Sequence, residues 1–220
     1  MLQLPDANQG RAAPVRPATP GVLSIWVASP DQPRACLLAD LISRIAERHH
    51  LLASVSQPAP AGWDALNVHP ADVRAGPPEP LDVAVAPAGG PAGTHLVRPG
   101  AARLPDLGGL DPLALRLALQ WHSYPEQVAL TRDDLETAGN VLRGWRELVG
   151  HWALSPSKPM CAQYVGDFLG ALDDDLDTPA ALRTLSELAA DTVIPDGSKF
   201  ETFAYMDRFL GLDLAREVGR

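Results

Sequence analysis

Four aspartates lie close together in the second half of the chain: Asp173, Asp174, Asp175 and Asp177. Clustered carboxylates supply the oxygen ligands that divalent cations such as Ca²⁺ and Mg²⁺ prefer. Carboxylates are also common where one helix ends and the next begins, because they stabilise a helix N-terminus. Thr178 and Pro179 follow the cluster and indicate a helix start. We therefore expect a structural role for the cluster and predict no metal site.

Histidine and cysteine are the other residue types here that could bind a metal or act as nucleophiles. His49 and His50 end a predicted helix, where an imidazolium interacts favourably with the helix dipole, and His122 is expected in the core or at its boundary. Cys36 and Cys161 are far apart and form no C-x-x-C pair, so we predict neither a disulfide nor a zinc site. Cys161 is expected to be a small buried apolar residue rather than a reactive thiol.

Ser29 and Asp31 are the polar side chains that could act at the end of the first predicted strand. Open α/β sheets bind ligands outside the carboxyl ends of their strands, so a nucleophile or base would be expected there. Neither residue has an identifiable partner. A phosphate-binding loop at this place needs glycine, and residues 29–34 contain none. The sequence therefore argues against a nucleotide sensor.

The elements that would position these side chains begin with an α/β pattern. Residues 22–29 are a β-branched apolar run typical of a strand, residues 34–50 follow helical spacing, and residues 51–56 form a second candidate strand. This is one βαβ unit, the start of a Rossmann-like half. Further short strands are expected at 81–86 and 95–97. Loops are expected at 57–80, 89–93 and 99–109, which are rich in Pro, Ala and Gly.

After Asp111 the pattern becomes helical throughout. Asp111-Pro112 and Thr178-Pro179 each predict a helix start, and residues 131–134 open another helix. A further helix is expected over 161–172, and Ser198 to Glu201 is predicted to form a capping box. The fold class is therefore α/β plus all-α, with a reduced parallel sheet followed by a helical bundle. The expected parts are an N-terminal arm at 1–20, a Rossmann-like domain at 21–100, a connecting segment at 101–125 and the bundle at 126–220.

Composition limits the classes of partner. The net charge is -9, so the overall field repels phosphate and argues against DNA binding. No apolar run approaches the roughly 20 residues of a membrane span, and the first twenty residues lack the apolar region of a secretory signal. We expect a cytoplasmic protein without a membrane partner.

Four arginines give the helical half some basic character: Arg116, Arg132, Arg143 and Arg146. Arg143 and Arg146 are three positions apart and so share a helix face. Asp133, Asp134 and Glu147 lie nearby, which favours a solvated face with ion pairs. These arginines are the candidates for a face that binds tRNA or a protein partner.

Three segments resemble the cysteinyl-tRNA synthetases and the related cysteine ligases of mycothiol biosynthesis. They are P-G-V-L-S-I-W-V-A-S-P at 20–30, D-P-L-A-L-R-L at 111–117 and D-D-D-L-D-T-P-A-A-L at 173–182. A weaker likeness covers 67–74. The likeness extends over nearly the whole chain and implies the class I synthetase architecture, with a bundle like the anticodon-binding domain. The family's catalytic domain is much longer, so we expect large internal parts to be missing.

This chain departs from the family at the residues that carry the chemistry. Ala28 stands where the family places a zinc-binding cysteine, and an alanine cannot bind zinc. Asp31-Gln32-Pro33 stands where the family has H-x-G-H, and 98–103 contains no lysine where the family has K-M-S-K-S. Arg98 and Arg103 are the cations left to stabilise a pentacovalent phosphate there. The resemblance thus implies that the zinc and ATP sites are lost and that no catalytic residues remain.

Two functions follow from these residues. The first is a non-catalytic synthetase-like binding or regulatory module, which associates with a protein partner, with itself or with tRNA. The second is a residual cysteine or aminoacyl ligase or transferase with altered chemistry. A candidate crevice for the second comprises Ser29, Asp31, Arg98 and Arg103. The acidic net charge favours a protein partner over tRNA.

Overall fold

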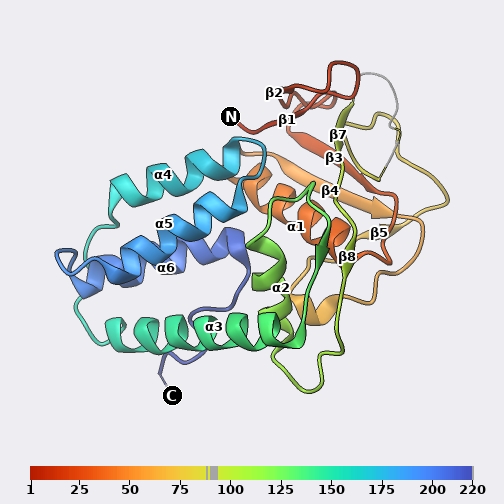
Figure 1. Cartoon of the computed structure of the whole chain (residues 1–220). Helices are drawn as coiled ribbons and strands as arrows, with labels where there is room; N and C mark the ends of the chain where they lie inside the picture. Colours follow the sequence, from red (N-terminus) through yellow and green to blue (C-terminus); the bar gives the residue numbers. More distant parts are fainter. Residues whose placement is uncertain (88, 90–93, 220) are drawn as a thin grey trace. The chain divides into compact units, whose positions relative to one another are not determined.

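The computed structural model describes residues 1–87, 89 and 94–219 (Figure 1). The chain divides into two compact units. The first comprises Met1–Arg103, Ser123–Ala129 and Leu172–Leu176, and the second comprises Leu104–His122, Leu130–Ala171 and Asp177–Arg220. The predicted division at residues 20, 100 and 125 stays a prediction, because compactness does not measure independent folding. Most of the loop expected at 89–93 lies outside the described residues.

A five-stranded parallel sheet forms the centre of the first unit, in the order β5-β4-β3-β6-β7. Its strands are β3 (Val22–Val27), β4 (Leu52–Gln57), β5 (Asp72–Val73), β6 (Val83–Val85) and β7 (His95–Val97). The helix α1 (Pro33–Arg48) connects β3 to β4. Successive strands run outward from β3 on one side and then on the other, which is the topology of a doubly wound sheet. The predicted Rossmann-like sheet is confirmed.

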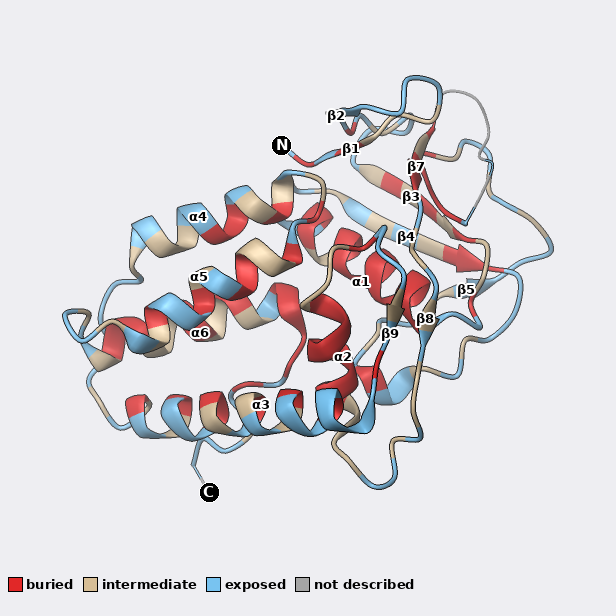
Figure 2. Ribbon diagram, in the orientation of Figure 1, coloured by how far each residue is buried: buried red, intermediate tan, exposed pale blue. Residues whose placement is uncertain are grey.

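Alternation along β3 explains why this segment forms a central strand. Leu23, Ile25 and Val27 are buried, whereas Ser24 and Trp26 on the opposite face are only half-buried. α1 is buried along most of its length, as Figure 2 shows. Burying one such aliphatic side chain stabilises a fold by about 1.5–3 kcal/mol. The helix and the buried face of β3 therefore fix the position of the residues that follow the strand.

The N-terminal residues form a hairpin, which differs from the flexible leader that their composition predicts. β1 (Gln3–Pro5) pairs antiparallel with β2 (Ala12–Pro14). Leu2, Leu4 and Val15 are buried, and the Ala7 amide donates to the Thr94 carbonyl beside β7. The strands are too short and too rich in proline to show periodicity. Their stability comes from these contacts rather than from local propensity.

The second unit is helical, as predicted. Its helices are α2 (Pro112–Gln120), α3 (Arg132–Trp152), α4 (Ala162–Asp173), α5 (Thr178–Ala190) and α6 (Asp196–Leu210). The Trp152 and Phe203 rings pack edge to face, with centroids 5.0 Å apart, and Phe168 is fully buried. Aromatic pairs of this geometry contribute about 0.5–1.5 kcal/mol to stability, in addition to the contribution of the apolar area that they bury. The helical part of the predicted fold class is therefore confirmed.

Helix starts were predicted with mixed success. The Asp111 carboxylate accepts the Leu113 amide at 2.9 Å, and Thr131 and Asp134 form a capping box at the start of α3. The N-cap of α5 is Asp177, one residue before the predicted Thr178. The predicted capping box at Ser198 is wrong, because α6 already begins at Asp196 after Pro195. An extended proline followed by an acidic first turn starts the helix earlier than the Ser-x-x-Glu pattern suggested.

Three short elements lie in segments that were predicted to be loops: the 3₁₀ turn η1 (Asp64–Leu66) and the strands β5 and β8 (Ala102–Arg103). β8 pairs in parallel with β9 (Val128–Ala129), which lies in the part that was predicted to be helical throughout. A two-residue strand carries no periodic signal, so only its partner reveals it. Within the part of the chain that the structure describes, no helix is long and apolar enough to cross a membrane.

Candidate functional site

The carboxyl edge of the sheet is where an α/β protein of this topology binds ligands. Ser29 follows β3 and is half-buried, and Asp31 is exposed. The Gln32 side-chain amide donates to the Asp31 carboxylate at 3.2 Å. Arg98 follows β7 at the same edge, but β6 lies between β3 and β7 in the sheet. Ser29 and Asp31 therefore have no charged group of the predicted set on an adjacent strand.

Arg34 occupies the first turn of α1, next to this edge, and the sequence did not single it out. Its guanidinium is 3% exposed and donates to the carbonyl of Ser123 at 2.8 Å and to that of Glu126. Burial lowers the pKa of Arg34, and the nearby Glu126 opposes that shift. The cation at the start of α1 is thus used to hold a neighbouring backbone segment.

The segment that carries Arg98 and Arg103 is fixed to the same backbone. The Gly100 amide donates to the Tyr124 carbonyl at 2.7 Å, and a Cβ at Gly100 would lie 2.0 Å from the Glu126 carbonyl oxygen. Only glycine permits this approach. β8 and β9 extend the contact, with Ala102 opposite Val128. Arg98 and Arg103 are both exposed, so neither cation lies in a buried site.

The residues at this edge do not fit the zinc ion that the resemblance implies. Ala28 offers no ligand. Cys36 is buried, and its thiol donates to the Pro30 carbonyl at 3.5 Å. Burial, with a smaller contribution from Asp31, raises the pKa of the Cys36 thiol to about 11, and zinc binds the thiolate. Among the described residues, no group of three or more His, Cys, Asp or Glu side chains could hold a metal ion.

The aspartate cluster lies between α4 and α5, as predicted, and its carboxylates take part in the fold. Asp173 accepts from Arg48 and from the His49 Nε2 atom, each at 2.7 Å. Asp175 accepts the Tyr124 hydroxyl at 2.8 Å, and Asp177 caps α5. Burial would raise the pKa of Asp173, but the bonds from His49 and Arg48 bring it below its ordinary value. The cluster is a structural junction.

Two arginines of the predicted binding face are buried, which corrects that prediction. Arg116 is 0% exposed, and its Nε donates to the Leu210 carbonyl at 2.5 Å. Arg146 is 6% exposed and donates to the Asp111 carboxylate at 2.6 Å and to the Leu212 carbonyl at 2.7 Å. Leu210 is the last residue of α6 and Leu212 follows it, and the last carbonyls of a helix have no partner within the helix. Both residues therefore stabilise the bundle.

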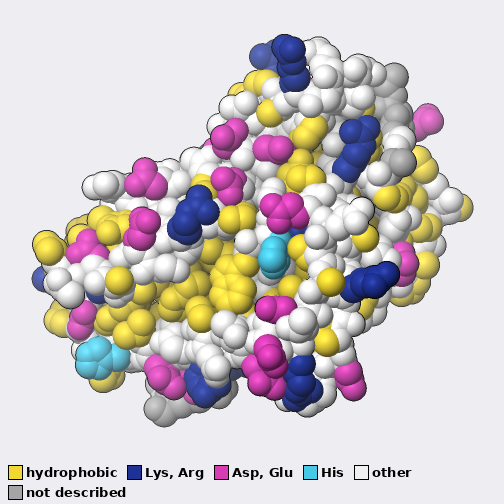
Figure 3. Space-filling view, viewed as in Figure 1, with side chains coloured by type: hydrophobic (Ala, Val, Ile, Leu, Met, Phe, Trp, Pro, Cys, Tyr) yellow, Lys and Arg dark blue, Asp and Glu magenta, His cyan; other side chains and the backbone are white. Residues whose placement is uncertain are grey.

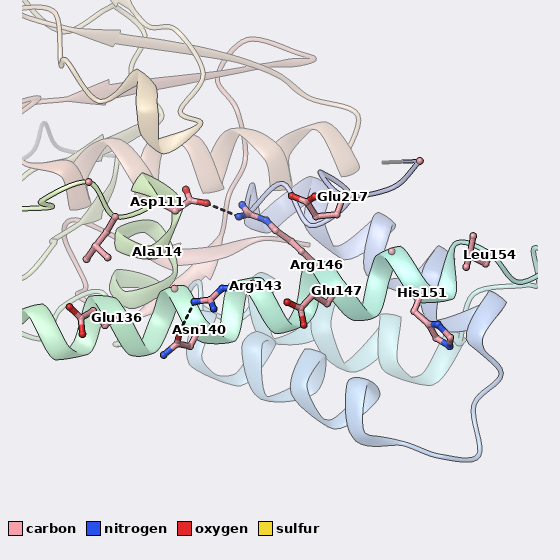
Figure 4. Close-up of a pocket in the computed structure, with 15 residues that line it drawn as sticks. Asp111, Ala114, Glu136, Asn140, Arg143, Arg146, Glu147, His151, Leu154 and Glu217 are labelled. Carbon is pink, nitrogen blue, oxygen red and sulfur yellow. Dashed lines mark hydrogen bonds and ion pairs between the residues drawn. The ribbon is translucent and has the colours of Figure 1, made fainter.

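Arg132 and Arg143 do lie on the surface of α3, where Arg132 pairs with Glu136 at 2.9 Å and Arg143 donates to Asn140 at 2.6 Å. Arg143 lies beside an open groove of about 1060 Å³ (Figure 4). The charged residues that line the groove are Asp111, Glu136, Arg143, Arg146, Glu147, His151 and Glu217. Acidic side chains thus outnumber the arginines, one of which Asp111 already neutralises. Polyanion binding is not favoured there.

A second hollow of about 340 Å³ lies beside α5 and is lined by Trp121, Pro179, Leu182, Arg183, Ser186 and Glu187. Figure 3 shows hydrophobic side chains gathered between α3 and α5, while basic side chains are dispersed among acidic ones. Trp145 and Trp152 are buried as core anchors, but Trp121 is half-buried. Cys161 is half-buried as well, rather than fully buried as predicted. An apolar hollow with a Trp wall suits an apolar partner group.

Comparison with known proteins gives a family relationship. No protein-family profile matches the chain. The L-cysteine:1D-myo-inositol 2-amino-2-deoxy-alpha-D-glucopyranoside ligase of Thermobifida fusca is 35% identical over 112 residues, which is 49% of this chain and 26% of the ligase. The ligases of the same name from Gordonia bronchialis and Rhodococcus erythropolis are 39% identical over 90 residues (41% and 21%) and 36% identical over 110 residues (48% and 26%).

The chain is a relative of these cysteine ligases, as its motifs predicted. The matched part spans about a quarter of the length of the curated relatives.

Proposed function

We propose that this relative of the cysteine ligases does not catalyse ATP-dependent ligation and acts as a binding or regulatory module in the cytoplasm. One observation carries the proposal. β3 leads into α1 through residues that hold neither a zinc ligand nor a phosphate loop, and the cation of that turn, Arg34, is buried against backbone carbonyls.

The chemistry of adenylation supports this proposal. Activating a carboxylate with ATP needs fixed positive groups around the phosphates at the transition state. Arg98 and Arg103 are exposed, and Gln32, the N-cap of α1, makes no side-chain cap. The residual-ligase alternative would need a nucleophile or base at this edge. Asp31 is exposed and its carboxylate accepts from Gln32, an environment that does not activate a carboxylate as a nucleophile or a base.

A protein partner is the preferred class of ligand. The net charge of -9 and the acidic lining of the groove on α3 oppose phosphate, whereas the hollow with the half-buried Trp121 and Pro179 offers apolar surface. tRNA is the second candidate, and Arg132 and Arg143 are the exposed cations that would contact it.

Capture of the tagged full chain from its own cells, with bound protein and RNA identified together, distinguishes the two. We expect a protein at stoichiometric yield in the wild type, lost on Trp121→Ala, which removes the half-buried ring from the hollow, and retained on Arg143→Glu. Enrichment of tRNA that disappears in moderate salt and on Arg143→Glu would contradict a protein partner. Arg11→Glu, an exposed change that lies in neither the hollow nor the groove, controls for net charge.

A further inference from the structure

His69 forms a fixed pair with a buried aspartate on the side of α1. Its Nδ1 lies 2.7 Å from the Asp40 carboxylate, whose side chain is 0% exposed, while the His69 side chain is 49% exposed. The same carboxylate oxygen accepts the His69 backbone amide at 3.0 Å. The ring therefore has one nitrogen against a buried anion and its other edge toward solvent.

Two further contacts fix the pair. The second Asp40 oxygen accepts from Arg44 Nε at 2.8 Å, and another nitrogen of Arg44 donates to the Asn67 carbonyl at 2.9 Å. Asn67 has a φ of 56°, a left-handed conformation that asparagine tolerates. The loop that carries His69 is thus held to α1 from two sides, so the ring position does not depend on the ring's own bond.

This geometry determines where the imidazole is reactive. A carboxylate accepts a proton-bearing nitrogen, so Asp40 selects the tautomer with hydrogen on Nδ1. The lone pair is then on Nε2, on the far side of the ring from Asp40, in the exposed half of the side chain. A histidine that a carboxylate holds in one orientation and one tautomer can act as a nucleophile or as a general base.

We propose that His69 is a nucleophile for activated carboxylic esters, with Asp40 as its positioning residue. Nε2 forms a bond to the carbonyl carbon, the ester C–O bond breaks, and the alcohol portion leaves with the bonding electrons. The acyl-imidazolium that results is positively charged, and the buried Asp40 carboxylate offsets that charge. Water then adds to the acyl carbon, the C–N bond breaks, and a carboxylic acid and the original imidazole are released, while the second proton of the water passes to solvent and balances the alkoxide or phenolate that left. No ATP is needed, so this chemistry is separate from the proposed binding function.

Hydrolysis of p-nitrophenyl acetate by the full chain tests the proposal. We expect His69→Gln to lower the rate of p-nitrophenolate release roughly tenfold or more, which is below the roughly 10²–10⁴-fold that positioned acids and bases contribute in enzymes. His151→Gln is the matched control, because its side chain is 72% exposed and approaches Asp196 only to 3.9 Å. It should leave the rate nearly unchanged. Equal rates for the wild type and His69→Gln would overturn the proposal.

Asp40→Asn tests the positioning role, with an expected fall in rate while His69 is still present. That variant removes a buried charge beside Arg44 and can fail to fold, so a measurement on the wild type accompanies it. Pulse labelling with diethyl pyrocarbonate, read by mass spectrometry for each histidine, should show His69 reacting faster than the more exposed His151. Labelling rates that follow exposure, with His151 ahead, would assign Asp40 a purely structural role and reject the dyad.

Discussion

At the scale of single residues, charge in this chain is used mainly to satisfy backbone groups. Arg34, Arg116 and Arg146 are buried and donate to carbonyl oxygens. The sequence held a signal for Arg116, because all but two of the residues from Leu113 to Gln120 are apolar, and the structure buries every one of them. An arginine inside such a helix must find partners within the protein. Helical spacing alone predicted that Arg116 lies on a surface face, because spacing shows which residues share a face but does not show how many faces of the helix are buried.

Replacing Arg116 by methionine should therefore reduce stability rather than affinity for a partner. The change removes the bond from the charged guanidinium to the Leu210 carbonyl, a kind of bond that contributes about 1.5–3 kcal/mol, and leaves that carbonyl with the bond from Gln120 at 3.1 Å. Urea unfolding followed by circular dichroism measures the difference. Arg143→Met, an exposed change in the neighbouring helix, should stay within about 0.5 kcal/mol of the wild type. Equal stability of the two variants would contradict the structural role of Arg116.

Asp111 gives a pH-dependent test of the ion pair in the bundle. Burial would raise its pKa, but the bonds from Arg146 and the Leu113 amide, together with the charge of Arg216, hold it below its ordinary value. A depressed pKa in the folded state contributes stability above the unfolded value of about 3.9 and loses it as the pH falls through the folded value.

Asp111→Asn keeps the helix cap but removes the charge. We expect the variant to be less stable than the wild type at pH 7, and the difference to narrow as the pH falls below about 4. Thermal melts across that range measure it. Two stability curves that stay parallel would show that the carboxylate charge does not contribute.

At the scale of elements, periodicity predicted the long or strongly alternating segments. β3, β4, α1 and α3 lie close to where they were expected. β3 and α3 each bury one regular face, whereas α1 is buried along most of its length. The hairpin at the N-terminus and the pairing of β8 with β9 could not be predicted, because two or three residues carry no period and their partners are distant in sequence. Gly100 is part of the same contact, and nothing in a single sequence distinguishes it from a glycine in a loop.

Alanine substitutions at two glycines should have opposite effects. Gly100→Ala places a Cβ against the Glu126 carbonyl, and the backbone shift that follows should destabilise the first unit by about 1–3 kcal/mol. Gly144 lies inside α3 with nothing within 4 Å of an added Cβ, so Gly144→Ala should stabilise by about 0.5–1 kcal/mol. Melting temperatures of both variants give the answer. If Gly100→Ala were instead more stable than the wild type, the close contact between Gly100 and the Glu126 carbonyl would be contradicted, and with it the placement of Arg98 and Arg103.

At the scale of the whole molecule, the chain combines a parallel α/β sheet with a helical part, and about half of it is similar to the cysteine ligases. The fold class could be predicted because three motifs and the strand-helix pattern agree. The candidate site could be predicted only as a set of missing groups, since a single sequence shows where Ala28 stands but not that Arg34 is buried. The acidic net charge and the apolar hollow beside α5 favour a protein partner over a nucleic acid.

The most direct test of this account is cysteine-dependent exchange of pyrophosphate into ATP by the purified full chain, with zinc and Mg²⁺ supplied. The account predicts no exchange above that seen without protein, at any cysteine concentration, because the residues at the carboxyl edge of the sheet neither bind zinc nor surround a phosphate. Exchange that saturates with both cysteine and ATP would contradict the proposed loss of catalysis and would show that the protein activates cysteine with ATP.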